Sequence, residues 1–302
     1  MKFQTTLNRE IRCFSVGLHS GRKVGMTIRP SGVDGGIVFV RKDLPQSDRI
    51  SASVHNVTDT TLATTLGTNG TRVLTVEHLM SAFHGMGVDN ALVEVDTFEV
   101  PIMDGSALPF VNLIAESGLK SQNKARKYLV IRKPVSVSDG ESTAMFKPSA
   151  RFEITYRIDF EHPAVGGQSY HVALSNGNYE REICAARTFG FLRDVEYLQA
   201  KGLALGGSLN NAVVLDDEKV INKEGLRCPD EFVKHKILDA IGDLYLIGVP
   251  IIGHFVAYKS GHKLNIQLLR ELLAKVDCWE MLNHEDLRKG LTESKPAAVS
   301  TR

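Results

Sequence analysis

The segment from Glu231 to Asp243 constrains the fold of this chain more than any other stretch. It predicts a helix, because its large apolar side chains recur near the 3.6-residue period and no glycine or proline interrupts it before Gly242. His235 and Asp239 are four residues apart and project from one face, with Asp243 a further turn along. This polar stripe can hold a divalent metal through imidazole nitrogen and carboxylate oxygen, or it can form an ordinary hydrogen-bonded pair.

A second predicted helix favours the metal interpretation. It starts near Thr75, a candidate N-cap, and contains the adjacent pair Glu77 and His78. A hydrolytic zinc site needs three protein ligands, an open position for water and a nearby base. His78, His235 and Asp239 would supply the ligands, and Glu77 the base. The spacing differs from H-E-x-x-H, in which one helix carries both histidines, so these ligands would come from two distant segments.

Composition argues against several classes of protein. The chain of 302 residues suits two domains, and 36 basic against 35 acidic side chains give a net charge of +1, so nucleic-acid binding is not expected. The four scattered cysteines indicate reduced thiols and a cytoplasmic protein. The first residues lack a signal-peptide core, and the most apolar stretch, Tyr245 to Tyr258, is too short and interrupted to span a membrane. Such a protein can still act on a lipid-bearing substrate at the membrane surface.

The order of the elements predicts two α+β domains, at 1–122 and 128–280. Residues 117–127 are polar and are interpreted as a linker, and the charged end, 284–302, as a flexible tail. Both halves show strands, then a helix, then a strand, which indicates a duplicated module. Strands are expected at 24–28, 36–40, 91–95, 128–131, 142–146, 152–157 and 250–258, and helices at 75–83, 109–115, 179–185, 230–246 and 263–275.

Shorter polar signals each allow two interpretations. The glycine-framed turn Gly17–Gly21 would expose His19 or bring backbone close to a ligand, but it also fits a plain hairpin turn. Phe189, beside Thr188, is either a core residue or a platform for a sugar. The small, apolar run Gly202–Gly207 is more typical of a loop around a narrow hydrophobic path than of a phosphate-binding loop, because no Lys-Ser/Thr follows it.

Seven segments together carry a resemblance to a known family: 17–21 (GLHSG), 75–80 (TVEHLM), 87–90 (GVDN), 100–106 (VPIMDGS), 186–191 (ARTFGF), 235–243 (HKILDAIGD) and 259–262 (KSGH). Between about residues 1 and 280 the chain resembles the UDP-3-O-acyl-N-acetylglucosamine deacetylases of bacterial lipid A biosynthesis. The resemblance implies an α+β fold of two similar domains, each a β-sheet layer with packed helices, with the active site between them. It also implies hydrolysis of the substrate's N-acetyl group with release of acetate, and a bound Zn²⁺, or Fe²⁺ in vivo.

The resemblance assigns roles to individual residues. His78, His235 and Asp239 match the metal ligands and Glu77 the general base. The remaining catalytic matches are the acid and electrostatic stabiliser His262, Asp243 that orients it, and the oxyanion donor Thr188. Substrate contacts are implied for Lys236, Lys259 and Phe189.

An apolar insertion around 192–214 corresponds to the passage for the fatty acyl chain, against the alternative of an ordinary packed β-α-β unit. The residues expected to line the passage are Leu192, Val195, Gly207, Ala212 and Val214. The chain departs from the family at Asn210, where several members carry Asp, and at Cys228, where Phe is frequent; neither position is catalytic.

Two other functions remain open from the sequence. One is a zinc amidase that acts on another acylated sugar. The other, which the near-neutral charge disfavours, is an RNA-binding α+β protein of the kind found in ribosomes. We expect a monomer whose partner is the UDP-sugar substrate, with no nucleic acid and no transmembrane segment.

Overall fold

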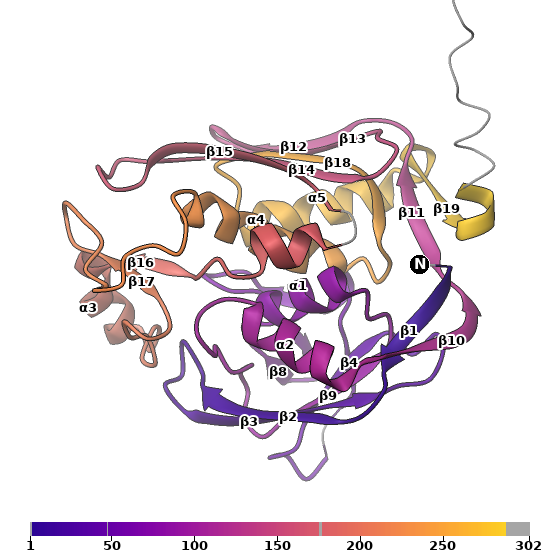
Figure 1. The fold of residues 1–302 in the computed structure, drawn as a ribbon, viewed down its shortest axis with the longest axis horizontal. Coiled ribbons are helices and arrows are strands. Elements are labelled where there is room, and N and C mark those ends of the chain that lie inside the picture. The colour runs from indigo at the N-terminus through magenta and orange to yellow at the C-terminus, as the bar shows by residue number, and fades with distance from the viewer. Residues whose placement is uncertain (1, 47, 175–176, 288–302) are drawn as a thin grey trace, which may run out of the picture.

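Two β-sheets enclose a layer of helices in the computed structural model, which describes residues 2–46, 48–174 and 177–287 (Figure 1). The first sheet, with the strand order β2-β3-β9-β4-β5, forms the lower layer in that view. Its strands are β2 (Ile11–Val16), β3 (Lys23–Pro30), β9 (Ala91–Val95), β4 (Ile37–Arg41) and β5 (Ile50–Ser51). Helix α1 (Glu77–Met86) precedes β9 in the chain, and α2 (Leu108–Ser117) follows it.

The second sheet forms the opposite layer and is built in the same way. Helix α4 (Glu231–Tyr245) precedes its central strand, and α5 (His262–Ala274) follows it. Its strands are β12 (Val135–Asp139), β13 (Ser142–Lys147), β18 (Ile251–Tyr258), β14 (Phe152–Phe160) and β15 (Gly166–Ala173), with β11 (Lys127–Ile131) and β19 (Trp279–Asn283) extending it.

The two halves share one topology. In the first half, β9 pairs antiparallel with β3 and parallel with β4. In the second, β18 pairs antiparallel with β13 and parallel with β14. Each central strand therefore follows one helix and precedes another, and both pairs of helices lie on the inner side of their sheet (Figure 1). The predicted α+β fold of two similar domains is confirmed, while the exact domain boundaries stay a prediction.

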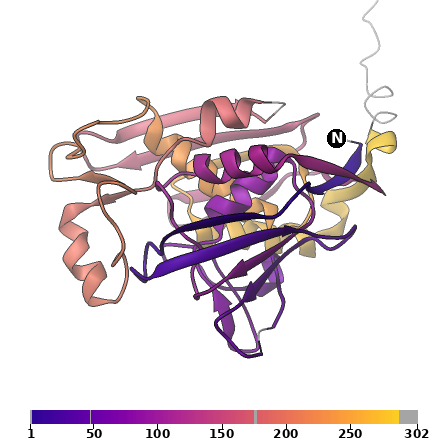
Figure 2. The same cartoon turned by 60° about the horizontal axis from the view of Figure 1, so that its bottom comes forward.

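Smaller elements decorate these layers. The segment after Arg187 projects from one side of the molecule as β16, α3 and β17 (Figures 1 and 2). The bounds are β1 (Phe3–Leu7), β10 (Leu119–Ala125), β6 (Val57–Asp59), β7 (Thr65–Thr68), β8 (Thr71–Val73), β16 (Phe189–Phe191), α3 (Leu192–Ala200) and β17 (Val213–Leu215). Short helical turns lie at Val54–Asn56, Tyr179–Ile183 and Val276–Cys278.

Helices α1 and α4 cross at the centre of the molecule, and a glycine permits their close approach. A Cβ atom at Gly242 would lie 2.0 Å from the carbonyl oxygen of Glu77, so a larger residue there would push the helices apart. The apolar faces pack around this crossing, with Leu79, Phe83 and Ile241 fully buried. Burial of each such side chain contributes about 1.5–3 kcal/mol. The crossing brings the start of α1 against the polar stripe of α4.

Two local predictions were wrong. Residues 117–127 connect the two halves but are not an irregular loop, because β10 pairs antiparallel with β1, Thr5 facing Ser121 and Leu7 facing Leu119. Most side chains of β10 are exposed, so its sequence lacks the alternation that identifies a strand, and its main-chain hydrogen bonds alone define it. Thr75 does not cap α1: the helix begins at Glu77 without a side-chain cap, and the Thr75 hydroxyl donates instead to Glu99.

Part of the predicted tail is helical. Residues 284–287 form a helical turn after β19, and the rest of that prediction, residues 288–302, lies outside the described residues.

Candidate metal centre and active site

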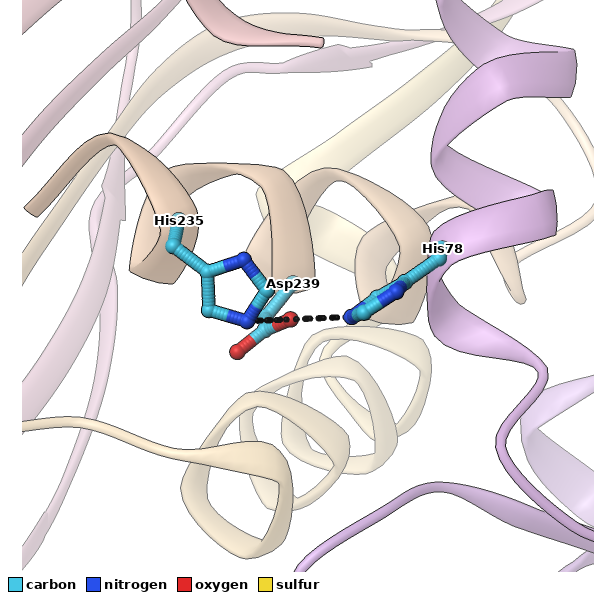
Figure 3. Close-up of side chains that lie close together, drawn as sticks. All are labelled: His78, His235 and Asp239. Atoms are coloured by element: carbon cyan, nitrogen blue, oxygen red, sulfur yellow. Dashed lines mark ion pairs between the residues drawn. The ribbon is translucent and has the colours of Figure 1, made fainter. Parts of the chain in front are cut away.

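Three buried side chains of ligand type converge where α1 meets α4 (Figure 3). His78 is the second residue of α1, and His235 and Asp239 lie one turn apart on α4. Nε2 of His78 is 3.4 Å from Oδ1 of Asp239, and Nε2 of His235 is 3.3 Å from the same oxygen. All three ligand atoms lie within 4.8 Å of one another. The helix crossing thus brings together the residues that the sequence places in two distant segments.

The arrangement fits a divalent metal ion. Ligand atoms held at about 2.0–2.1 Å around a tetrahedral ion are about 3.4 Å apart, close to the separations between Asp239 and each imidazole. Oδ1 of Asp239 is buried and has no hydrogen-bond partner, which is costly for a carboxylate unless a cation neutralises it. His235 offers its Nδ1 to the carbonyl of Ala186 at 3.1 Å, which leaves the lone pair of Nε2 facing Asp239.

Burial and neighbouring charges keep His235 and Asp239 in the forms that a metal requires. Burial lowers the pKa of His235 to about 3, so its imidazole is neutral at pH 7. Burial disfavours ionisation of Asp239, but His235 and Lys236 outweigh it and lower the pKa of this carboxyl below its ordinary value. The Lys236 ammonium donates to Oδ2 of Asp239 at 2.6 Å, which leaves Oδ1 directed at the histidines.

Glu77 lies beside the centre and is fixed from the opposite side. As the first residue of α1 it is buried, and its Oε2 accepts a hydrogen bond of 3.0 Å from the backbone N–H of Thr64. Burial raises the pKa of its carboxyl, opposed by His262 and His78. A carboxylate with a raised pKa takes up a proton more readily, which suits a general base.

His262 and Asp243 form a second buried pair at the same site. Nδ1 of His262, the first residue of α5, is 2.9 Å from Oδ2 of Asp243. Asp243 also accepts hydrogen bonds from the Thr64 hydroxyl at 2.6 Å and from Asn265 at 2.9 Å. Burial by itself would lower the pKa of His262, but Asp243 and Glu77 outweigh it and raise the pKa to about 9. The imidazole is therefore cationic at neutral pH, with its orientation fixed by the aspartate.

A cavity of about 690 Å³ joins this polar centre to an apolar wall. Its lining includes His78, His235, Asp239, Glu77 and His262 at one end. The lining also includes the predicted oxyanion donor Thr188 and every predicted substrate residue except Lys259: Phe189, Lys236, Leu192, Val195, Gly207, Ala212 and Val214.

One predicted substrate residue lies elsewhere. Lys259 is absent from the lining, and its Nζ is 3.2 Å from Glu141 and 3.3 Å from Asp159. Its contact with substrate remains a prediction that needs a ligand portion extending beyond this cavity.

The apolar wall has the connectivity of a β-α-β unit in which Val213 and Leu215 of β17 are fully buried and only the helix stands outside the core. Strands β16 and β17 pair in parallel, and α3 connects them. No residue of α3 is buried, although Leu192, Val195 and Leu198 line the cavity. The alternative of an ordinary packed unit therefore holds for β17 but not for α3, and the role of 192–214 as a passage stays a prediction.

Several residues of the site carried no recognisable signal in the sequence. Thr64 bridges Glu77 and Asp243 from a segment without a motif, and Leu62 lines the cavity from the same segment. The sequence left open whether the turn exposes His19, brings backbone close to a ligand or is a plain hairpin turn; His19 is buried and lines the cavity, because the loop around Ala204 covers it. Only the glycines that frame the turn at 17–21 hinted at this close contact.

The donor set and its neighbours define a class of site: a candidate mononuclear metal centre with acid–base groups beside it, open to a cavity with an apolar wall. Residues 4–274 match the family model of the UDP-3-O-acyl N-acetylglycosamine deacetylases. The chain therefore belongs to the UDP-3-O-acyl N-acetylglycosamine deacetylase family.

Individual relatives agree along almost the whole chain. The chain is 61% identical to the UDP-3-O-acyl-N-acetylglucosamine deacetylase of Syntrophus aciditrophicus over 298 residues, covering 98% of this chain and 95% of the relative. It is 53% identical to proteins of the same name from Saccharophagus degradans and Pseudomonas entomophila, each over 285 residues and 94% of both chains. Among the described residues, no helix is long and apolar enough to cross a membrane.

Proposed function

We propose that this chain removes the N-acetyl group of UDP-3-O-acyl-N-acetylglucosamine, an early step of lipid A biosynthesis, with one divalent metal ion held by His78, His235 and Asp239. The observation that carries the proposal is the convergence of these three ligand atoms beside a buried glutamate at the polar end of an apolar cavity. Zn²⁺ is the ion we expect, because two imidazoles, one carboxylate oxygen and an open position match its catalytic sites; Fe²⁺ is the alternative.

An acetamide is a poor electrophile, and water is a poor nucleophile at neutral pH. When bound, the metal would polarise the acetamide carbonyl and make water a stronger nucleophile. Glu77 takes the proton from the attacking water, since its carboxylate lies next to His78 with its Oε2 anchored by Thr64. The same carboxyl can then pass this proton to the departing amine.

Two further groups would handle the charge that develops. The cation of His262, oriented by Asp243, stabilises negative charge on the former carbonyl oxygen and can donate a proton to the amine. Thr188 lines the cavity and supplies a hydroxyl donor to the same oxygen. Lys236 acts in part through Asp239, whose carboxylate it orients.

The apolar wall would receive the fatty acyl group of the substrate. Leu192, Val195, Gly207, Ala212 and Val214 all line it, and each buried methylene contributes about 0.8 kcal/mol. Phe189 also lines the cavity, with its ring 6.2 Å from that of His235, where it can contact the sugar. We further propose that the protein is a cytoplasmic monomer, and that it meets its lipid-bearing substrate near the membrane surface.

One pair of measurements tests the function. The purified protein should contain about one equivalent of Zn²⁺ or Fe²⁺, and it should release acetate from UDP-3-O-acyl-N-acetylglucosamine far faster than from UDP-N-acetylglucosamine. Comparable rates on both UDP-sugars, or a preference for a different acylated sugar, would mean that the protein has a different substrate but performs the same deacetylation chemistry. Full acetate release from protein stripped of metal would remove the metal from the proposal.

A further inference from the structure

Glu99 is a buried carboxylate that lies behind the cavity rather than in it. It follows β9, is 0% exposed, and lies on a segment where backbone hydrogen bonds join Leu74 to Phe98 and Val100. Three uncharged donors satisfy its carboxylate. The backbone N–H of His19 donates to Oε1 and that of Ser20 to Oε2, each at 2.8 Å, and the Thr75 hydroxyl donates to Oε1 at 3.0 Å. One side chain thus binds two segments that are far apart in the sequence.

One of these segments, which contains Thr75, leads directly into the catalytic helix α1. Thr75 has φ of 60°, which is strained for a β-branched residue, and it lies two residues before Glu77. A left-handed residue needs its surroundings to hold it in place. The bond from its hydroxyl to Glu99 provides such a restraint and thereby fixes the direction in which the chain enters α1.

The second segment, residues 17–21, is called here the His19 turn. It approaches Glu99 so closely that a Cβ atom on Gly17 would lie 2.2 Å from Oε2 of the carboxylate. The two oxygens of the carboxylate accept hydrogen bonds from consecutive backbone N–H groups of the turn. A carboxylate suits this position better than a neutral side chain, because each of these buried donors needs an acceptor.

On its other side the His19 turn supports the wall of the cavity. Residues 203–207, called here the passage loop, are hydrogen-bonded to it: Leu205 N–H donates to the His19 carbonyl at 3.1 Å and Gly206 N–H to the Leu18 carbonyl at 3.0 Å. A Cβ atom on Gly206 would lie 2.2 Å from the Gly17 carbonyl oxygen, so the two backbones are in direct contact. Ala204 and Gly207 of this loop line the cavity, as do Leu18 and His19.

We propose that Glu99 is a positioning residue that fixes the passage loop and the catalytic end of α1 relative to each other, and that it thereby contributes to selection of the acyl chain. The contacts run from the strained Thr75 through Glu99 to the His19 turn, and from that turn to the passage loop. This inference rests on the proposed function for its substrate. The hydrogen bonds from Thr75 and from the His19 turn to Glu99, together called here the Glu99 clamp, can be tested without an activity assay.

Glu99→Gln is the informative variant, because the amide keeps the shape but has one acceptor oxygen, so one backbone N–H of the turn loses its partner. Amide hydrogen exchange at His19, Ser20, Leu205 and Gly206 should accelerate about tenfold or more, the size expected for a lost hydrogen bond to a charged group. KM should rise about tenfold for a long-acyl substrate and less than about threefold for a short-acyl analogue, and kcat should fall about tenfold for both.

Two further variants separate the arms of the clamp. Thr75→Val removes only the hydroxyl bond, so kcat should fall while exchange in the His19 turn stays unchanged. Gly206→Ala pushes the passage loop off the turn without touching Glu99, so it should raise KM for the long-acyl substrate alone. Because it leaves Glu99 intact, this variant tests the coupling even where Glu99→Gln does not fold. Glu94→Gln, a matched loss of charge on β9 with its ion pairs to Arg29 and Lys42, serves as the control and should change none of these quantities.

The outcomes discriminate clearly. Unchanged exchange in Glu99→Gln, or faster exchange with an equal change of KM for both substrates, overturns the proposal. If Gly206→Ala leaves the long-acyl KM unaltered, the coupling from turn to loop is likewise refuted. A protein with accelerated exchange in Glu99→Gln but no deacetylase activity in any form would keep the clamp and reject the proposed function instead.

Discussion

The two ends of the cavity are built in different ways. At the metal end, His78, His235 and Asp239 are 3–4% exposed and belong to the two helices that cross in the core. At the passage end, α3 has no buried residue, and Leu192, Leu205 and Leu209 are 43–49% exposed. Bond-making chemistry needs atoms held within fractions of an ångström, whereas contact with an alkyl chain is non-directional and scales with area. Changes at the metal end should therefore act on kcat, and changes at the passage end on KM.

The largest effect should come from removing a ligand. His235→Ala leaves two of the three ligand atoms, so the protein should lose its metal and its turnover should fall to background while the fold persists. Metal analysis, circular dichroism and acetate release check this, with the exposed His55→Ala as the matched control. Full metal content together with normal turnover in His235→Ala would end the assignment of the centre.

Glu77 should affect chemistry without affecting metal content. Glu77→Gln keeps the size of the side chain but cannot accept the proton of water, so kcat should fall roughly 10²–10⁴-fold, the usual contribution of a general base. Metal content and KM should stay close to those of the wild type. A parallel loss of metal would instead indicate that Glu77 is a metal ligand, so that ligand and general base could no longer be assigned to separate residues at the metal end.

The pH dependence of kcat tests the role of His262 at the metal end. Since the pKa of His262 is raised to about 9, the imidazolium persists at neutral pH and is lost as pH rises through that value. A bound cation nearby would lower the pKa, so the basic limb of kcat should fall at or below about pH 9. His262→Ala should reduce kcat about 10²-fold and abolish this limb, as measured by rates between pH 5 and 10. An unchanged basic limb would exclude His262 as its source.

The smallest effect is expected at the passage end. Gly207 has no positive φ and lines the cavity; a Cβ atom there would be 3.3 Å from the carbonyl oxygen of Ala204, so a larger side chain requires a shift of a few tenths of an ångström. Gly207→Leu should raise KM for a long-acyl substrate about 10–100-fold, as expected when a few methylenes lose their site, and change it far less for a short-acyl analogue. The metal should remain bound.

Gly32 offers the matched control for that substitution. It is exposed, has open space around its Cα and lies in a loop of the first half. Gly32→Leu should therefore leave KM unchanged for both the long-acyl substrate and the short-acyl analogue. Equal losses for both substrates in Gly207→Leu would mean that the passage end, too, serves chiefly to hold the fold.

Local pattern predicted the helices α1, α2, α4 and α5 and the central strands of both sheets, but fewer than half of all the strands among the described residues. The strands at 91–95 and 142–146 and the helices at 230–246 and 263–275 lie within one or two residues of β9, β13, α4 and α5, because their apolar periods match the faces that become buried. The strand β10 escaped prediction, since a polar strand exposed on both faces has no period to detect.

The sequence by itself determined which chemical groups are available and which of them share a helix face. His235 and Asp239 had to lie one turn apart once α4 formed, whatever surrounded them. Tertiary structure decided that His78 meets them, because a helix crossing that depends on Gly242 brings α1 within reach. It also decided that Thr64 and Glu99 anchor the site, and that the segment 192–214 forms a wall beside an open cavity. These features rest on contacts between residues many positions apart, whose geometry no local period encodes.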